Sequence, residues 1–279
     1  NLHKKHQQTF KSFNVNLANF HSTHSEENKR LTAEIFTKAL EKKFIHKKKI
    51  SQLFDEKEQI FLSDRFVKGT CPSCNAEDQY GDACEKCGST YDALELINPK
   101  SVLSNTLPVI RESEHYFFKL SELQSYLKTN IQQISKQSPI KAKLDEWLEE
   151  DLKDWDVSRD EPYFGFNIPG ETTKYIYVWM DAPVGYLASI QNWTNKNNID
   201  FKELVNDEDV RLVHFIGKDI VYFHLLFWPA MLKTADINNL EEVFVHGFLT
   251  IEGNKMSKSK GNFILADKAL YFANPDYYR

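Results

Sequence analysis

The stretch around which this chain is organised lies near its end and reads Glu252-Gly253-Asn254-Lys255-Met256-Ser257-Lys258-Ser259-Lys260-Gly261-Asn262. Three lysines stand among small and hydroxyl residues, with a glycine near each edge. On a flexible turn such ammonium groups can converge on one multiply charged anion, and serine hydroxyls and backbone N–H groups can donate to its oxygens. The glycines supply the backbone freedom that lets a loop open and close. A lysine-rich turn can also be a plain solvated loop, so the interpretation depends on what precedes it.

Repeated strand, turn and helix patterns precede the lysine loop. The predicted strands are 175–179, 211–216 and 243–249. Helices are predicted from Tyr186 onward and over 220–233. Such a succession predicts a parallel sheet, in which ligands bind beyond the carboxyl ends of the strands. The loops 181–186, 217–220 and 253–261 should therefore meet at one edge of the sheet.

The four cysteines of the chain form two C-x-x-C pairs, Cys71/Cys74 and Cys84/Cys87, with nine residues between the pairs. Each pair can present two thiolates from one tight turn, and two such turns complete a tetrahedron around Zn²⁺. Asn75 and Gly88 can take the left-handed conformation that closes each knuckle. A redox function would normally use a single C-x-x-C at a helix start. Because four thiolates leave no coordination position for water, the predicted zinc is structural rather than catalytic.

Composition and charge limit the other possibilities. The chain has 279 residues, of which 41% are hydrophobic and 13% aromatic, as expected of a globular protein. It contains no apolar run of about 18 residues, so we expect no membrane partner, and from its polar start we expect no secretory leader. We therefore expect a cytoplasmic protein. The net charge of −5 argues against broad nucleic-acid binding but leaves room for a local phosphate site.

Two further groups of residues allow two interpretations each. Arg159 stands between Asp156 and Asp160, which is typical of a local ion-pair cluster. The helix after Asp219 carries an apolar face, which can be core packing or can contribute its first turn to a ligand slot. The residues of that face are Ile220, Phe223, His224, Phe227, Trp228 and Met231. Together with Ala182, Pro183 and Tyr186, the first turn would form an apolar slot with few polar groups, which suits a flexible thioether.

The lysine stretch resembles the KMSKS motif of class I aminoacyl-tRNA synthetases. The segments WDVSRD (155–160), YVWMDAPVGY (177–186) and HFIGKDIVYFH (214–224) resemble the methionyl-tRNA synthetase family in particular. The resemblance implies an α/β fold: the second half of a Rossmann-like parallel sheet, with an inserted connective domain that carries the zinc knuckle. The domains expected are the end of the first Rossmann half (1–25), the insertion (26–174), the second half (175–250) and the KMSKS region (251–279).

The resemblance also implies roles for particular residues. The reaction is attack of the methionine carboxylate on Mg-ATP to give methionyl-adenylate, followed by transfer to tRNA(Met). Lys258, assisted by Lys255, would stabilise the departing pyrophosphate, and Arg159 would neutralise a carboxylate or a phosphate. Asp219 would either cap its helix or bind the ribose. The remaining expected ATP contacts are Met256, Ser257 and Ser259; the expected methionine contacts are Trp179, Ala182, Pro183, Tyr186, Ile220, Phe223 and His224.

The family's HIGH motif and its anticodon-binding domain are not found in the sequence, which predicts a fragment that makes no adenylate by itself. Two alternatives remain open. The chain can be a zinc-ribbon binding module with an inert α/β remainder, or a class I synthetase for isoleucine, valine, leucine or cysteine. Neither G-x-G-x-x-G nor a Walker A pattern occurs, which disfavours a dinucleotide dehydrogenase and a P-loop enzyme.

Overall fold

The structure is a computed structural model that describes residues 2–82, 84–87, 89, 91–237, 240–256 and 261–278. Its internal contacts divide the chain into two compact units. The parallel-sheet unit comprises Asn1–Phe44, Lys119–Lys153 and Trp179–Arg279, and the antiparallel unit comprises Ile45–Phe118 and Asp154–Val178. The segments 26–44 and 119–153 thus group with the parallel strands, whereas the domain borders given above stay a prediction. Within the described residues, no helix has the length and apolarity needed to cross a bilayer.

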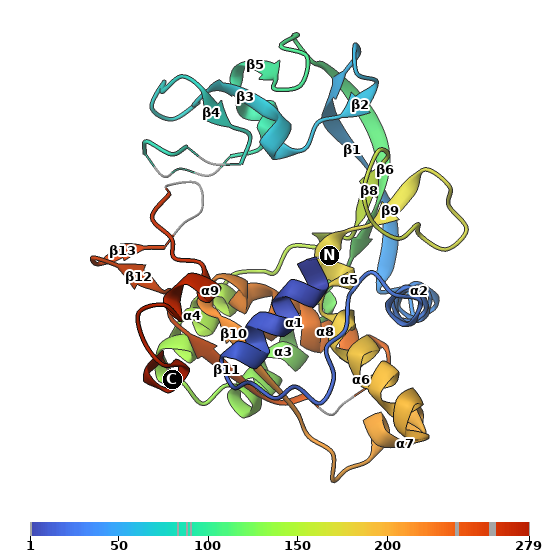
Figure 1. Ribbon diagram of the computed structural model, residues 1–279. Helices are drawn as coiled ribbons and strands as arrows, with labels where there is room; N and C mark the ends of the chain where they lie inside the picture. Colours follow the sequence, from blue (N-terminus) through green and yellow to red (C-terminus); the bar gives the residue numbers. More distant parts are fainter. Residues whose placement is uncertain are drawn as a thin grey trace. The chain divides into compact units, whose positions relative to one another are not determined.

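The parallel-sheet unit is built on two neighbouring strands, β10 (Leu212–Gly217) and β11 (Leu240–His246), which run parallel and pair Gly217 with His246 at their carboxyl ends (Figure 1). Burial alternates along both strands, so that His214, Ile216, Val243 and Val245 face the core. Helical residues 218–234 connect the two strands, as a parallel pair requires. A hairpin of β12 (Thr250–Ile251) and β13 (Asn254–Lys255) follows β11.

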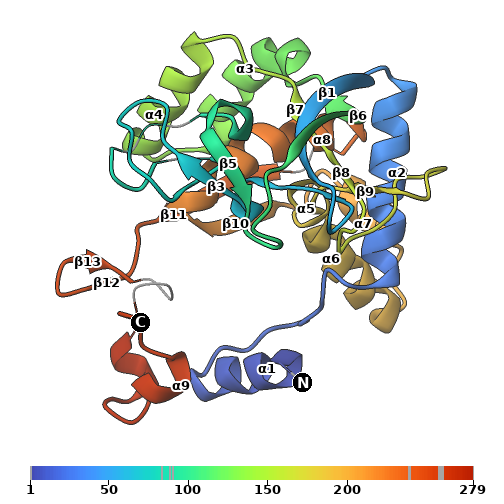
Figure 2. The same cartoon turned by 90° about the horizontal axis from the view of Figure 1, so that it is seen from above.

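Helices supply the rest of this unit. They are α1 (Leu2–Ser12), α2 (Glu26–Glu41), α3 (Gln124–Ile134), α4 (Ser138–Glu149), α6 (Val184–Asn197), α7 (Phe201–Asn206), α8 (Trp228–Thr234) and α9 (Ala266–Ala269), with the short turns η3 (Leu120–Leu123), η4 (Lys218–Ile220) and η6 (Pro275–Tyr278). The helix α5 (Val178–Asp181) lies at the border of the two units in sequence. Fully buried side chains of the core include Phe36, Leu127, Leu144, Trp228 and Met231. Figure 2 shows α1 beside α9, where Lys5 and Asp267 form an ion pair of 3.5 Å.

The N-terminus of α2 illustrates how local sequence sets an element. Ser25 is the N-cap, and its hydroxyl accepts a hydrogen bond from the Asn28 N–H at 3.2 Å. Glu26 and Glu27 stand in the first turn, where carboxylates interact favourably with the helix dipole. The apolar face formed by Leu31, Ile35 and Ala39 is buried, as the spacing of these residues predicts.

The helix predicted over 220–233 is interrupted by one wide turn. Residues Phe223–Phe227 form a π-helical turn, closed by a hydrogen bond from the Trp228 N–H to the Phe223 carbonyl. Pro229 follows at the start of α8 and has no N–H for the carbonyl of Leu225, which favours this widening. The helix is thus not regular over its whole length, yet His224 and Trp228 both contact the Tyr186 ring and Phe223 contacts Phe227, so these predicted residues still lie on one side.

The antiparallel unit contains three small sheets. The first has the order β2-β1-β6-β7, with β1 (Ile45–Asp55) paired along its length with β6 (Val109–Phe118) and flanked by β2 (Ile60–Phe61) and β7 (Trp155–Asp156). The second has the order β4-β3-β5: β4 (Gln79–Tyr80), β3 (Val67–Thr70) and β5 (Ile97–Ser101). The third pairs β8 (Ser158–Asp160) with β9 (Lys174–Ile176). Short turns η1 (Asp64–Phe66) and η2 (Ala93–Glu95) complete the unit.

Two strand predictions are corrected by these pairings. The strand expected at 175–179 ends at Ile176, pairs antiparallel with β8 and belongs to the antiparallel unit, so it is not a strand of the parallel sheet. Trp179 instead lies in α5. A run of β-forming residues gives no information about its partner strand, because pairing is a long-range property. The strand expected at 243–249 spans Leu240–His246.

Candidate active site and candidate metal centre

The carboxyl ends of β10 and β11 bring two of the predicted loops together. Gly217 ends β10 and is followed by η4, while His246 ends β11 and is followed by the β12–β13 hairpin. The hairpin turns at Glu252 and Gly253, which have φ values of 51° and 78°. Positive φ at both central residues is the geometry of a type I′ turn, which matches the twist of its two strands. The turn 217–220 and the start of the lysine loop thus leave the sheet at the same edge.

The lysine loop is described up to Met256 and again from Gly261. The Met256 N–H donates to the Leu249 carbonyl at 2.9 Å, and the Asn262 amide donates to the Lys255 carbonyl at 3.0 Å. The ammonium of Lys255 lies 3.6 Å from the centre of the Phe248 ring. Ser257, Lys258, Ser259 and Lys260 lie outside the described residues, so the predicted contacts of Ser257, Lys258 and Ser259 stay predictions.

A second lysine, not singled out by the sequence, reaches the same aromatic ring. Lys218 is the first residue of η4, and its ammonium lies 4.1 Å from the centre of the Phe248 ring. Lys218 and Lys255 therefore lie at one ring although they are 37 positions apart in sequence. The neighbouring Asp219 is exposed, and its carboxylate folds toward Gly217: a Cβ at position 217 would lie 2.7 Å from the Asp219 Oδ1. A side chain at position 217 would displace this carboxylate.

Two aromatic side chains of the predicted methionine slot are stacked. Trp179 of α5 and Phe223 of the π-turn lie with ring centres 4.0 Å apart and planes within 4°. Pro183 is buried at the start of α6, with Ala182 half-buried beside it. Burial raises the pKa of the neighbouring Asp181 to about 6, against the opposing effect of the Asp181 and Ala182 N–H groups. The structure thus brings Trp179 and Phe223 into direct contact at this edge.

Tyr186 and His224 form the polar part of this group. The Tyr186 hydroxyl and the His224 Nε2 are 2.8 Å apart, and the His224 Nδ1 is 3.0 Å from the Ile220 carbonyl. Burial lowers the pKa of His224, so the ring is neutral near pH 7. Because a carbonyl only accepts, the ring proton is on Nδ1 and the Tyr186 hydroxyl donates to Nε2. The phenol oxygen keeps its acceptor capacity for a ligand.

A buried histidine supports the Tyr186 ring from the core side. The rings of Tyr186 and His214 meet edge to face, with centres 4.5 Å apart, and the Trp228 Nε1–H donates to the His214 Nε2 at 3.3 Å. Burial, followed by the proximity of His224, lowers the pKa of His214 to about 4. His214 is therefore neutral at physiological pH, and this aromatic group contains no buried imidazolium charge.

Asn28 connects α2 to the loop that begins the slot. Its side chain is fully buried, and its amide donates to the carbonyls of Thr23 at 2.9 Å and Asp181 at 3.3 Å. Gly185 allows the approach, since a Cβ there would lie 2.6 Å from the Thr23 methyl carbon. No local motif in the sequence points to this contact, which joins residues more than 150 positions apart.

Arg159 belongs to the antiparallel unit. Its guanidinium lies 3.3 Å from the Asp156 carboxylate, donates to the Ser158 carbonyl at 2.5 Å and covers the Tyr177 ring at 3.7 Å. The local ion pair with Asp156 is confirmed. Asp160, on the other side in sequence, pairs instead with His115 and Lys174. The role of Arg159 toward a substrate stays a prediction.

The four cysteines converge as their spacing predicts. The four Sγ atoms lie within 4.8 Å of one another, with Cys74 and Cys84 3.6 Å apart and Cys71 and Cys87 3.9 Å apart. A tetrahedral site with Zn–S bonds of about 2.3 Å requires sulfurs roughly 3.8 Å apart. Asn75 has φ = 58°, as predicted for the residue that closes the first knuckle; Gly88 lies outside the described residues. The donor set and its spacing fit one tetrahedral metal ion.

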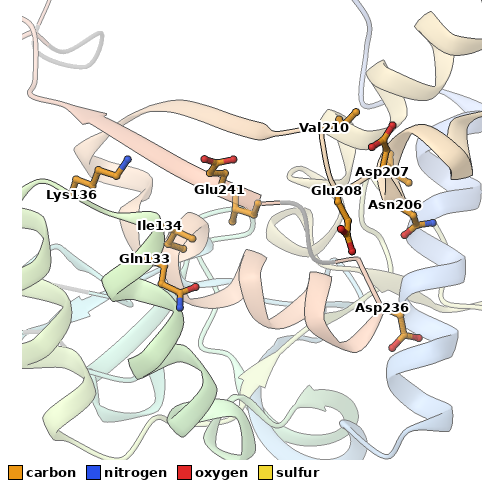
Figure 3. A pocket seen from close by; sticks show the side chains of 11 residues that line it. Gln133, Ile134, Lys136, Asn206, Asp207, Glu208, Val210, Asp236 and Glu241 are labelled. Atoms are coloured by element: carbon orange, nitrogen blue, oxygen red, sulfur yellow. The ribbon is translucent and has the colours of Figure 1, made fainter.

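A hollow elsewhere in the parallel-sheet unit is lined by none of the predicted site residues (Figure 3). Its volume is about 750 Å³. Leu240 and Glu241 of its lining begin β11, so it lies at the amino end of that strand, whereas His246 and the lysine loop lie at the carboxyl end. Ligands of parallel sheets bind at the carboxyl ends, so the cavity gives no reason to move the candidate site.

The fold and the candidate site define an α/β protein with a ligand edge at the carboxyl ends of parallel strands and a separate cysteine knuckle. The family model described as tRNA synthetases class I (M) matches residues 1–279. The chain therefore belongs to this class I tRNA synthetase family. Its fold is the α/β fold of that family, with the cysteine-bearing unit inserted in sequence into the parallel-sheet unit.

Solved structures with the same fold are methionyl-tRNA synthetases of Mycobacterium tuberculosis. One, in complex with methionyl-adenylate, has a TM-score of 0.70 and 22% identity, and the match covers 99% of this chain and 49% of that one. Another, bound by methionyl-adenylate, has a TM-score of 0.69 and 21% identity over 98% and 48% of the two chains. The apo form has a TM-score of 0.59 and 20% identity over 88% and 44%. The chain thus spans about half the length of these structures.

Proposed function

We propose that the chain is part of a methionine–tRNA ligase, which activates methionine with ATP to methionyl-adenylate and transfers it to tRNA(Met). The observation that carries the proposal is the meeting of the lysine loop and the turn 217–220 at the carboxyl edge of the parallel strands, in a chain of the class I tRNA synthetase family. The methionyl-adenylate in the matched structures supports methionine as the amino acid.

In the proposed reaction the protein positions and stabilises rather than supplying a nucleophile. The methionine carboxylate attacks the α-phosphorus of Mg-ATP, and pyrophosphate leaves. Lys258, assisted by Lys255, stabilises the charge that develops on the pyrophosphate. Met256, Ser257 and Ser259 complete the ATP contacts of the loop. The exposed Asp219, next to Gly217 at the same edge, binds the ribose.

The methionine side chain would occupy the apolar slot. The stacked Trp179 and Phe223, with Ile220, Ala182 and Pro183, supply polarizable and apolar surface for a thioether. The Tyr186–His224 pair supplies the polar group of the slot, because the Tyr186 phenol oxygen can still accept a hydrogen bond from the substrate. Arg159 is proposed to neutralise the substrate carboxylate or a phosphate; both of its polar contacts use Nη1, and a guanidinium carries five N–H donors.

The cysteine knuckle is proposed to bind one structural Zn²⁺ through Cys71, Cys74, Cys84 and Cys87. When bound, the ion cross-links two turns of a small sheet that buries little surface of its own. The backbone N–H of Cys87 donates to the Cys84 sulfur at 3.4 Å, and the Ser89 hydroxyl lies 3.0 Å from the Cys87 sulfur. Such donors stabilise thiolates, the form that binds metal.

The proposal is tested by amino-acid-dependent ATP–pyrophosphate exchange with the protein that carries residues 1–279. We expect exchange with methionine and at least ~10-fold less with leucine, isoleucine, valine or cysteine, because a packed slot separates side chains that differ by one or two groups by that order. Substituting Lys258→Ala should lower the exchange rate by ~10²-fold or more, with Lys196→Ala as the control on an exposed helix end.

Two results would contradict the proposal. Exchange that depends on one of the other amino acids would assign a different class I synthetase. Exchange that is unchanged in Lys258→Ala would reject the role of the lysine loop. A protein that binds zinc but neither methionine nor ATP would instead be the zinc-ribbon module.

A further inference from the structure

Phe248 lies at the centre of an arrangement that the proposed ATP contacts do not explain. It is half-buried two residues beyond the end of β11, and two ammonium groups lie on its ring, that of Lys255 at 3.6 Å and that of Lys218 at 4.1 Å. The distance between the two ammonium nitrogens therefore cannot exceed the sum of their distances to the ring centre. One cation on a ring is common, whereas two cations on one ring repel each other.

Neither ammonium has a carboxylate partner among the described residues. Several other lysines of this chain form ion pairs, as Lys42 does with Asp236 at 2.6 Å and Lys68 with Asp78 at 2.8 Å. Within residues 2–256 and 261–278, leaving out the few positions that are not described, no ion pair is found for Lys218 or Lys255. Among the described residues, their charges are thus held close together with no carboxylate in ion-pair contact.

The backbone explains why the two lysines meet. Gly217 and His246 are paired at the ends of parallel strands, so the residues that follow each of them start from neighbouring positions. Lys218 follows β10 directly, and the tight turn at Glu252–Gly253 returns the chain so that Lys255 lies opposite Thr250, close to Phe248. The fold therefore places the pair, and no adjustment of a long loop is required.

We infer that Lys218 is a further phosphate-contacting residue, and that Phe248 is a positioning residue that holds the Lys218 and Lys255 ammoniums for a polyphosphate. A chain of phosphates carries several charges over a few ångströms and can bridge two cations that lie this close. Binding removes their mutual repulsion, while the aromatic face keeps both side chains near the sheet edge before the anion arrives. This inference rests on the proposed function, since it extends the nucleotide site to β10.

The direct test uses inorganic tripolyphosphate as the probe, titrated calorimetrically into the chain. We expect Lys218→Ala to weaken tripolyphosphate binding ~10-fold, similar to Lys255→Ala, as for loss of one charge-assisted contact. The matched control is Lys233→Ala, because Lys233 also lies over an aromatic ring, that of Tyr126 at 5.4 Å, but stands in the last turn of α8 and not in the segments that directly follow β10 and β11. This control should bind as the unmodified chain does.

Two substitutions at position 248 test whether Phe248 positions the two ammonium groups. Phe248→Tyr keeps an aromatic face and should retain binding, whereas Phe248→Leu keeps apolar volume without the ring quadrupole and should weaken tripolyphosphate binding ~3-fold or more. A purely structural role would instead be met equally well by both variants. In the protein that carries the chain, Lys218→Ala should raise the KM for ATP and leave the KM for methionine unchanged.

The outcomes separate this inference from the proposed function. If methionine-dependent exchange is observed, and Lys218→Ala binds tripolyphosphate as Lys233→Ala does, the inference alone is wrong. The same conclusion follows if exchange is observed and the unmodified chain does not bind tripolyphosphate at all. If the protein neither exchanges nor binds tripolyphosphate, the proposed function fails, and the inference fails with it.

Discussion

The Asn28 amide is fully buried and joins two carbonyls that belong to different segments, Thr23 before α2 and Asp181 before α6. It is surrounded by further polar pairs between the two helices. Arg30 donates to Gln191 at 2.6 Å, and Asn192 donates to Glu27 at 2.9 Å. Because a lost buried donor leaves its acceptors unpaired, the position of the loop 181–186 depends on this residue.

We predict that Asn28→Leu lowers the free energy of unfolding by about 1–3 kcal/mol and weakens methionine binding more than ATP binding. Urea denaturation and substrate KM values measure the two effects. The control is Asn197→Leu, since the Asn197 amide donates at 2.7 Å only within its own exposed helix end. Equal losses in the two variants, or equal changes in both KM values, would show that Asn28 does not position the slot.

The cysteine knuckle and the β4-β3-β5 sheet behave as one element. Cys71 and Cys84 pack with Ala76 in a small buried cluster, and Tyr91 packs both on this cluster and on the neighbouring core of Leu53 and Val67. The Tyr91 hydroxyl donates to the Tyr80 carbonyl at 3.0 Å. With few apolar residues of its own, the element depends on a cross-link for its order.

For this element we predict about one zinc per chain, and almost none in Cys84→Ser, because three thiolates and a hydroxyl bind zinc much more weakly than four thiolates. Hydrogen exchange should then accelerate in β3, β4 and β5 and stay unchanged in β10 and β11. Metal analysis and exchange mass spectrometry measure this, with Ser73→Ala as the control inside the first knuckle. Normal exchange rates in a zinc-free chain would contradict a structural role.

At the scale of the whole molecule, stability should depend on a buried charge network in the antiparallel unit. The His115 side chain is 1% exposed, with Nδ1 2.7 Å from Asp156 and Nε2 2.9 Å from Asp160. Asp160 also accepts from Ser113 at 2.7 Å and pairs with Lys174. Burial opposes the charge on His115, but the hydrogen bonds to the two carboxylates outweigh it and raise the pKa of His115.

The two pKa shifts give opposite dependences on pH. The raised pKa of His115 contributes stability that is fully present below about pH 6.5, the usual value in unfolded chains, and is lost as pH rises through the folded value. For Asp160, burial raises the pKa but hydrogen bonds from His115, Lys174 and Ser113 prevail and lower it to about 2. That contribution is present above about pH 4 and is lost as pH falls toward 2.

We therefore predict that His115→Gln lowers the free energy of unfolding by about 2 kcal/mol at pH 5 and by less at pH 9, because the contribution of the raised pKa decreases as pH rises through the folded value. Chemical denaturation at the two pH values measures the difference. His46→Gln is the matched control, because the His46 Nε2 lies 3.7 Å from Asp154 on a half-exposed surface. A loss in His115→Gln that is the same at both pH values would rule out a charged His115.

The features that could be predicted from the sequence are local ones. The cysteine spacing predicts the knuckle, the helical period of Leu31, Ile35 and Ala39 predicts the apolar face of α2, and the alternation of strands and helices predicts the parallel pair. Contacts between distant segments could not be predicted in this way: the antiparallel partner of β9, the buried Asn28 amide, and the meeting of Lys218 with Phe248. These depend on three-dimensional packing, which residue types alone do not specify.

The π-helical turn at Phe223–Phe227 has a consequence for how this protein can vary. In a continuous α-helix one extra residue rotates everything beyond it by about 100°, and a π-turn takes up such a residue locally. A single-residue deletion that this turn does not absorb would rotate Phe223 away from Trp179 and His224 away from Tyr186, or pull Trp228 out of the interior. The segment should accordingly tolerate many substitutions of side chains and hardly any insertion or deletion of residues.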